Sequence, residues 1–282
     1  MNISNAIAYS DTGEKGNPII LIHGLFDNKE TWSWTAPYLN NHRLITPDLL
    51  GHGESNKESF SASIKKEGLT PNLHSECIRD LILQLDLNNF VIGGSSYGGS
   101  IALNTYIRYP EIRERTKGIV LIAAAGYQKY IPRYVRRMGG WLGYILQKHL
   151  IYKFCYKTGL IKNGVKQSIK RCFYNSNSVP IDLFDNLIRQ LSDMRLIEGY
   201  HLTARCLIGL DFKIIQKQLY SVICPTLIIW GRQDQIIPPH NALYFARDLP
   251  NTEVAWIENC GHAPHIEKAK QTGNCIKKFC DN

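Results

Sequence analysis

A serine, an aspartate and a histidine in three separate loops are of the residue types that carry out acyl transfer. Ser96 is the centre of Gly94-Ser95-Ser96-Tyr97-Gly98, a G-x-S-x-G motif that follows the apolar run 90–92. A serine at a sharp strand-to-helix turn needs strained backbone angles, and the flanking glycines leave room for the helix to pack on the strand. The motif predicts a raised Ser96 hydroxyl, with the Tyr97 N–H directed at a developing oxyanion.

A serine hydroxyl is a poor nucleophile at neutral pH, so it needs a base, and the base needs a carboxylate to orient it. Asp234 lies in the loop after the apolar run 225–231, and His262 lies in the loop after 252–257. Loops at the carboxyl ends of parallel strands converge on one edge of a sheet. We therefore expect Ser96, Asp234 and His262 to lie along the same edge.

The elements that would position these loops can be predicted from the apolar pattern. Continuous apolar runs are typical of strands that are buried on both faces of a parallel sheet. Helix-like segments such as 72–87, which has the apolar spacing of an amphipathic helix, alternate with the runs. The pattern predicts an α/β fold with a mostly parallel open sheet flanked by helices. The runs that fit strands are 18–22, 43–47, 90–92, 118–125, 225–231 and 252–257.

Four further segments carry local predictions. We expect residues 1–17 to form a hairpin that closes at 11–13, and residues 31–39 to form a helix. The polar segment 56–69 is expected to be a surface loop, and 266–279 to be the closing helix.

The segment 127–217 interrupts the alternation, because it has helical runs and no convincing strand. It predicts a helical insertion, or cap, in a single core made of 1–126 and 218–282. The formal net charge of +9 is concentrated in this part of the chain. Residues 126–217 hold 16 Lys and Arg against 5 Asp and Glu, whereas the rest of the chain holds 17 against 19.

Aromatic and apolar residues between 141 and 156 alternate with lysines. This composition favours an apolar roof over Ser96 with a cationic exterior, which suits an acidic carrier protein or an anionic membrane surface. A solvated basic face on ordinary packed helices is the simpler alternative. Nucleic acid is not an expected partner, because no recognition motif is visible.

The composition restricts cofactors and location. The eight cysteines are scattered without a C-x-x-C pair, and His262 and His265 have no second pair of ligands at metal spacing. We expect reduced thiols, no bound metal and no cofactor. The sequence shows neither a secretory signal nor an apolar stretch of about 20 residues, which favours a cytoplasmic protein.

The chain resembles the α/β-hydrolase superfamily, and within it the small serine esterases and lipases with a helical cap. The resemblance covers residues 5–125 and 220–280. It rests on four motifs taken together, which are His23-Gly24, the segment 48–55, the serine motif, and the two loops that hold Asp234 and His262.

The resemblance implies a role for each motif residue. Ser96 would be the nucleophile, His262 the general base and then acid, and Asp234 its orienting carboxylate. The Tyr97 N–H would form one half of the oxyanion hole and the Leu25 N–H the other, with Phe26 as the alternative to Leu25. The Tyr97 side chain is expected to be a wall of the pocket.

Three neighbouring residues are expected to be structural. His23 and His52 would form hydrogen bonds within their own loops, and Asp48 would hold its turn together. The stretch from Gly261 to Glu267 resembles the family pattern G-H-x-P-x-x-E, which identifies His262 rather than His265 as the catalytic histidine.

The implied reaction is hydrolysis of a carboxylic ester with an apolar acyl group, through an acyl-enzyme. The substrate would be a small-molecule ester, a lipid-like ester, or a methyl ester carried by an acyl carrier protein. One alternative is a hydrolase of the C–C bond in aromatic ring-fission products, which uses the same three side chains. Another is a non-catalytic binding protein built on a hydrolase core.

Overall fold

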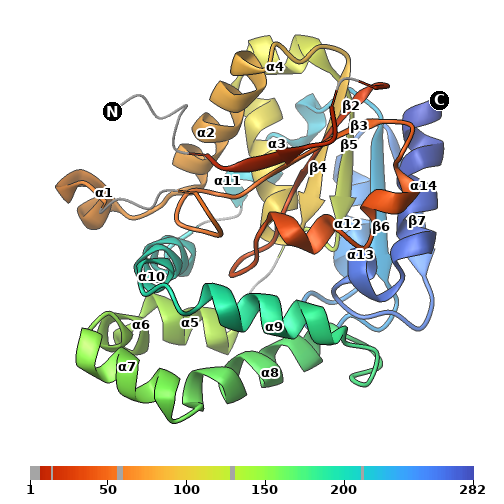
Figure 1. Cartoon of the computed structure of the whole chain (residues 1–282). Coiled ribbons are helices and arrows are strands. Elements are labelled where there is room, and N and C mark those ends of the chain that lie inside the picture. Colours follow the sequence, from red (N-terminus) through yellow and green to blue (C-terminus); the bar gives the residue numbers. More distant parts are fainter. Residues whose placement is uncertain (1–6, 14, 56–59, 128–130, 211–212) are drawn as a thin grey trace.

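The computed structural model describes residues 7–13, 15–55, 60–127, 131–210 and 213–282. Its centre is a single sheet of seven strands in the order β1-β3-β2-β4-β5-β6-β7 (Figure 1). Only β1 runs antiparallel to its neighbour, and all other pairs are parallel. The strands are β1 (Tyr9–Asp11), β2 (Pro18–Ile22), β3 (Arg43–Pro47), β4 (Phe90–Ser95), β5 (Thr116–Ile122), β6 (Thr226–Gly231) and β7 (Thr252–Ile257).

Helices connect and cover the strands. Before β5 these are α1 (Ala62–Glu67), α2 (Pro71–Gln84), α3 (Tyr97–Arg108) and α4 (Pro110–Arg115). After β6 they are α12 (His240–Asp248), α13 (Pro264–Glu267) and α14 (Ala269–Asp281). Short 3-10 helices are η2 (Lys29–Trp32), η3 (Ala36–Tyr38) and η4 (Leu219–Ser221).

Both faces of the sheet are buried, which explains why its strands are apolar throughout. Ile20 and Ile22 of β2 belong to the core on the face covered by α2, α3 and α12, whereas Ile19 and Leu21 belong to the core on the face covered by α14. All four side chains are fully buried. Because successive residues of a strand point to opposite faces, an unbroken apolar run is the pattern that two covered faces require.

The segment between β5 and β6 is helical, and no strand occurs in its described residues. In Figure 1 the helices α5 to α9 lie along the lower edge of the sheet, separate from its two flanking layers. The helices of this segment are α5 (Arg133–Gly139), α6 (Trp141–Leu146), α7 (His149–Lys157), α8 (Leu160–Cys172), α9 (Ile181–Gln190), α10 (Arg195–Ile208) and α11 (Lys213–Gln216).

Two of the local predictions near the N-terminus are wrong. The hairpin within residues 1–17 does not form from the described residues, because β1 pairs with β3 instead, with Ser10 opposite Thr46. The helix expected over 31–39 is replaced by η2 and η3. Pro37 lacks an N–H and lies in the first turn of η3, so a continuous helix is interrupted there.

The other two local predictions hold in part. Residues 56–59 of the expected loop 56–69 lie outside the described residues, and α1 forms within the remainder, capped by the Ser61 hydroxyl. The closing helix is divided into α13 and α14.

All eight cysteines are free thiols. In the described part of the chain, no helix combines the length and the apolar character needed to span a membrane.

Candidate active site

Ser96 lies at the sharp turn between β4 and α3. Its φ of 53° and ψ of −115° are unusual for a residue with a side chain, and such angles cost about 1–3 kcal/mol. The neighbouring strand holds this turn in place, because the Ser96 N–H donates to the Ile122 carbonyl at 2.9 Å and the Ser96 carbonyl accepts from the Ala125 N–H at 2.9 Å. A strained residue fixed by its surroundings is typical of functional sites.

The flanking glycines are required by close backbone contacts. A Cβ on Gly94 would lie 2.5 Å from the Ile22 carbonyl oxygen, and a Cβ on Gly98 would lie 2.2 Å from the same atom. Both distances are far below van der Waals contact. The predicted reason for these glycines, close packing of α3 against the strands, is therefore what the structure shows.

Asp234 and His262 meet at the ends of two adjacent strands. Asp234 follows β6 and His262 follows β7, and the Asp234 Oδ2 lies 2.7 Å from the His262 Nδ1. The other carboxylate oxygen of Asp234 accepts from the N–H groups of Ile236 and Ile237 at 2.8 and 2.9 Å. The carboxylate is fully buried, and these bonds fix its orientation. A histidine held this way keeps a proton on Nδ1 and leaves Nε2 available as a base.

No hydrogen bond joins Ser96 to His262, both of which are described residues. Ser96 directly follows β4, which is separated from β6 by β5 alone, so the three residues follow strands of the same half of the sheet. Catalytic hydrogen bonds are often long without substrate and shorten in the substrate complex.

The loop after β2 lies directly against Ser96. A Cβ on Gly24 would lie 3.5 Å from the Ser96 Cβ, and the next residues, Leu25 and Phe26, continue the loop. Among the described residues, no acceptor is recorded for the N–H groups of Leu25, Phe26 or Tyr97. Three backbone donors on two elements are therefore present around the serine turn, and Leu25 and Phe26 both stay candidates.

Asp48 and His23 hold this loop in place. The Asp48 carboxylate accepts from the Lys29 N–H at 2.6 Å and from the Glu54 N–H at 2.8 Å, so it joins its own turn to the loop after β2. His23 bridges its own Gly24 carbonyl and the Leu49 N–H. Both structural interpretations are confirmed.

Lys29 adds an ionic link to the same turn. Its ammonium group lies 2.7 Å from Glu54 and 3.3 Å from Asp48. Burial alone would lower the pKa of Lys29, but the two carboxylates outweigh it and raise that pKa above its usual value. The charged lysine therefore fastens the turn after β3 to the loop beside Ser96.

The Tyr97 side chain is part of the buried core beside the serine turn. Its hydroxyl lies 2.9 Å from the His74 Nδ1. Its expected place in a pocket wall stays a prediction. The opposite nitrogen of His74 donates to the Leu50 carbonyl at 3.1 Å. Burial lowers the pKa of His74 to about 4, and it also lowers the pKa of His52. The His52 ring contacts the Leu50 carbonyl, which confirms the predicted hydrogen bond within its own loop.

His265 is separate from the Asp234–His262 pair. It lies 3.0 Å from the Thr31 hydroxyl, and its ring packs on Trp32. Burial lowers the pKa of His265 to about 3, so the ring is neutral at pH 7. His262 and not His265 is thus the histidine that contacts Asp234.

Glu267 is a site residue whose role the sequence did not indicate. Its carboxylate accepts from the N–H groups of Gly261, Tyr174 and Asn175 at 2.7, 3.0 and 2.9 Å. The His262 N–H donates to the Cys172 carbonyl at the end of α8, at 2.6 Å. Glu267 therefore links the His262 loop to the inserted helices. The only sequence signal is its position in the G-H-x-P-x-x-E pattern.

Aromatic side chains from the inserted helices contact the loop after β2. The ring of Phe26 lies 5.1 Å from that of Tyr200 on α10 and 6.1 Å from that of Tyr134 on α5. Beside them, burial raises the pKa of the Asp27 carboxyl. Phe26 therefore packs among aromatic rings, whereas Lys29 and Asp48 form a polar network at the other end of the loop.

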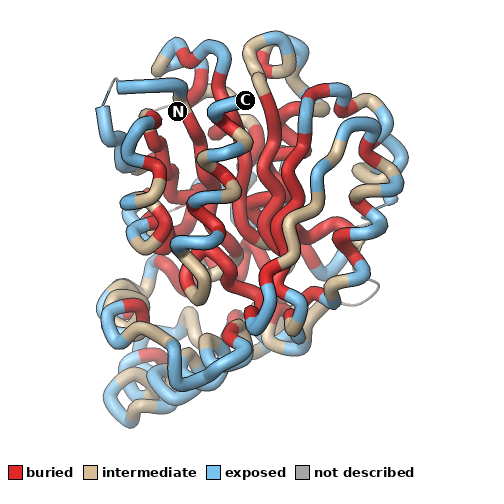
Figure 2. Tube along the Cα trace, turned by 90° about the vertical axis from the view of Figure 1, so that its right-hand side faces the viewer, coloured by how far each residue is buried: buried red, intermediate tan, exposed pale blue. Residues whose placement is uncertain are grey.

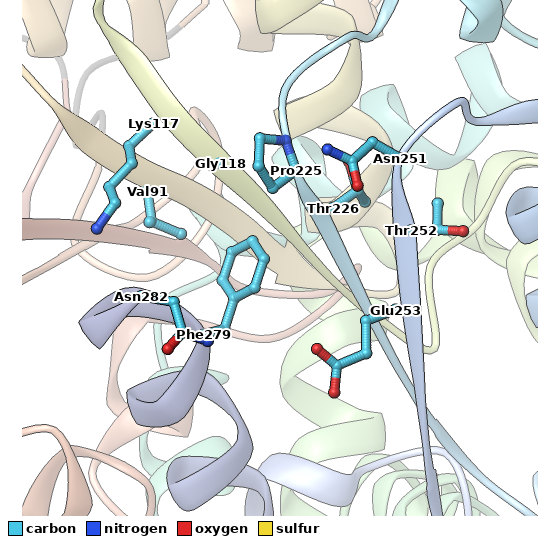
Figure 3. A pocket seen from close by; sticks show the side chains of 10 residues that line it. All are labelled: Val91, Lys117, Gly118, Pro225, Thr226, Asn251, Thr252, Glu253, Phe279 and Asn282. Atoms are coloured by element: carbon cyan, nitrogen blue, oxygen red, sulfur yellow. The ribbon is translucent and has the colours of Figure 1, made fainter.

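A cavity of about 330 Å³ lies elsewhere, at the amino ends of β5, β6 and β7 (Figure 3). Its lining includes Lys117, Thr226 and Glu253. The Lys117 ammonium group donates to the Cys280 carbonyl at 2.9 Å. Because Ser96, Asp234 and His262 follow the carboxyl ends of their strands, this cavity is not part of their site.

Known proteins are similar to this chain in sequence and in structure. Lipase 3 of Moraxella sp. (strain TA144) is 28% identical over 276 residues, which cover 94% of this chain and 78% of that protein. An esterase from Thermogutta terrifontis superposes with a TM-score of 0.76 at 21% identity, over 98% of this chain and 93% of that one. A meta-cleavage product hydrolase from Pseudomonas fluorescens IP01 superposes with a TM-score of 0.77 at 21% identity, over 98% and 94%.

The two structural likenesses show the fold alone, since an esterase and a meta-cleavage product hydrolase match equally well. The family model for the alpha/beta hydrolase fold matches residues 17–269, which include the serine turn and the loops of Asp234 and His262. Together with the parallel sheet and its helical layers, this match shows that the chain belongs to the α/β hydrolase fold family.

Proposed function

We propose that the protein hydrolyses carboxylic esters of apolar acyl groups, with Ser96, His262 and Asp234 as its catalytic residues. The observation that carries the proposal is the Asp234–His262 hydrogen bond at the carboxyl edge of the sheet whose strand β4 ends in the strained Ser96 turn. The relationship to Lipase 3 of Moraxella supports ester hydrolysis over other reactions of the same fold.

In the first half of the reaction, the Ser96 Oγ attacks the ester carbonyl carbon while the His262 Nε2 takes the hydroxyl proton. The carbonyl oxygen becomes an oxyanion that the N–H of Tyr97 and that of Leu25 stabilise, with Phe26 as the alternative to Leu25. Losing one such donor typically costs about 10²–10³ in rate. The tetrahedral intermediate then collapses, and His262 returns the proton to the departing alcohol.

In the second half, water attacks the acyl-enzyme. His262 takes a proton from the water and returns it to the Ser96 Oγ as the acid product leaves. Asp234 stays ionised and stabilises the imidazolium form of His262 in both halves.

The helices of residues 127–217 act in this proposal as a cap, and residues 1–126 and 218–282 form the core. The ring contacts of Phe26 with Tyr134 and Tyr200 support an apolar acyl site between the oxyanion loop and the cap. Such a site favours esters with a hydrocarbon or aromatic acyl group, because their burial is worth about 25 cal/mol per Å² of apolar surface.

The test is a series of p-nitrophenyl esters of increasing acyl chain length, assayed with the wild type and with Ser96→Ala. We expect turnover that improves with chain length, and loss of that turnover in Ser96→Ala with an unchanged thermal unfolding temperature. Turnover of a ring-fission product and of an acyl carrier protein methyl ester is measured in parallel, to compare the other two substrate classes with the simple esters. Turnover of the ring-fission product alone contradicts ester hydrolysis, and full activity of Ser96→Ala contradicts the assignment of the nucleophile.

A further inference from the structure

Six large apolar side chains are exposed on the outer side of α6, α7 and α8. Each is between 41 and 80% exposed, and a group of such residues, unlike a single one, is typical of an interaction surface. They come from consecutive helices that lie at the edge of the molecule, where Figure 2 shows mostly exposed chain. We call this set the docking face, and it consists of Trp141, Tyr144, Leu150, Ile151, Phe154 and Leu160.

The helix α7 has two apolar sides, and only one of them is used for folding. On its inner side, Tyr152 is buried and donates to the Leu191 carbonyl, and Tyr156 donates to the Ile188 carbonyl. On its outer side, Leu150 and Phe154 are one helical turn apart and stay exposed. Packing inside the molecule therefore does not account for the outer residues.

Basic residues surround and interrupt the docking face. Lys148 lies over the ring of Tyr144, at 4.9 Å from its centroid, and Lys153 and Lys157 follow along α7. Between residues 131 and 181 the sequence has ten Lys and Arg and no Asp or Glu. An apolar surface with cations and no carboxylate is complementary to a layer that is apolar inside and anionic at its surface.

Two features favour a lipid layer over a protein partner. The centres of protein interfaces are depleted in lysine, whereas here lysines lie between the apolar residues. Lysine suits a lipid surface because its stem can lie along the apolar layer while its ammonium group reaches the headgroups. Tryptophan and tyrosine, present here as Trp141 and Tyr144, are enriched at membrane–water interfaces.

We propose that the docking face binds the surface of an anionic phospholipid bilayer, with the apolar side chains entering the headgroup boundary and the lysines pairing with lipid phosphates. In this orientation the sheet lies away from the bilayer and the inserted helices lie between the two (Figure 1). Of these helices, α8 begins at Leu160 in the docking face and ends at Cys172, whose carbonyl accepts from the His262 N–H. A lipid ester at the bilayer surface would thus be close to the proposed catalytic site.

The test is sedimentation with vesicles of phosphatidylcholine alone and of phosphatidylcholine mixed with phosphatidylglycerol. We expect binding to the anionic vesicles only, weakened by added salt because screening reduces attraction between charges. The double variant Leu150→Ser/Phe154→Ser should bind at least about tenfold more weakly, and so should Lys153→Glu/Lys157→Glu. Both keep the inner side of α7 intact, and thermal unfolding checks that they fold.

Matched controls alter exposed residues outside the docking face. Ile223→Ser removes a side chain that is 72% exposed just before β6, and Lys270→Glu reverses a charge on α14. Both controls should bind as the wild type does. Wild-type protein that stays in solution with anionic vesicles at low salt overturns the proposal, as does equal weakening in the controls. An acidic carrier protein that binds where vesicles do not also overturns it.

Vesicle binding is independent of the proposed function, because the Ser96→Ala variant should bind as well as the wild type. A protein that binds vesicles but hydrolyses no ester therefore contradicts the proposed function only. A protein that hydrolyses esters but does not bind vesicles contradicts only the proposed role of the docking face.

Discussion

The sheet and the inserted helices use large apolar residues in different ways. In the sheet, Ile19 and Ile20 are both fully buried, one on each face. Of the fifteen large apolar side chains that are exposed in the described part of the chain, nine lie between residues 131 and 208. The apolar residues of the sheet fix the positions of three loops, whereas part of those in the inserted helices stay exposed and form the proposed docking face. Changes in the first region should affect chemistry and stability, and changes in the second should affect binding.

The largest expected contrast is between two aspartates, one in each region. Asp234→Asn should reduce kcat by about 10⁴-fold, because an amide in place of the carboxylate favours the wrong histidine tautomer. Asp182→Asn, at an exposed position in the first turn of α9, should leave kcat unchanged. Steady-state kinetics with one p-nitrophenyl ester measures both, and similar losses in the two variants would remove the contrast between the regions.

The next contrast concerns the junction of the two regions. Glu267→Gln replaces one carboxylate oxygen by an amide group, so at least one of the N–H groups of Gly261, Tyr174 and Asn175 loses its acceptor. Such bonds to a charged group are worth about 1.5–3 kcal/mol. We expect kcat to fall about tenfold or more with KM little changed, because the His262 loop loosens. An unchanged kcat would show that the sheet alone positions this loop.

Acid should lower the free energy of unfolding of the protein, because His265 is buried in its neutral form. Burial lowers the pKa of His265 in the folded protein to about 3, from 6.5 in the unfolded chain. Between these values the unfolded chain binds more protons, so stability is lost as the pH falls below about 6.5. At pH 5 the loss from His265 is about 2 kcal/mol. Denaturant unfolding at pH 7.5 and at pH 5 measures this loss. In His265→Gln, the free energies of unfolding at the two pH values should lie closer together. A difference that is as large in His265→Gln contradicts this origin.

The smallest effect is expected on the docking face. Leu150→Ser should change the free energy of unfolding by less than about 0.5 kcal/mol, because the side chain is 80% exposed and surface changes are usually that small. The matching change in the core, Leu21→Ser, should cost several kcal/mol, since it places a hydroxyl at a fully buried position. Denaturant unfolding of the two variants compares them. A large loss in Leu150→Ser would mean that the outer side of α7 is part of the packed structure.

Features that depend on local sequence patterns could be predicted, whereas contacts between residues far apart in the sequence mostly could not. The strands could be predicted because burial on both faces leaves an unbroken apolar run, as in 18–22. The pairing of β1 with β3 could not, because it joins Ser10 to Thr46 across a long stretch of chain. The Asp234–His262 contact could be predicted because adjacent parallel strands bring their loops together. The role of Glu267 depends on the end of α8, more than 90 residues earlier, which no local pattern indicates.

In the proposed reaction, Ser96 is a nucleophile that His262 activates. Labelling of the folded protein with a fluorophosphonate, followed by peptide mass spectrometry, tests it most directly. We predict one covalent adduct, on the peptide that holds Ser96, and strongly slowed labelling in His262→Ala. A folded wild-type protein that carries no adduct on Ser96, or labelling that is equally fast in His262→Ala, would contradict the account.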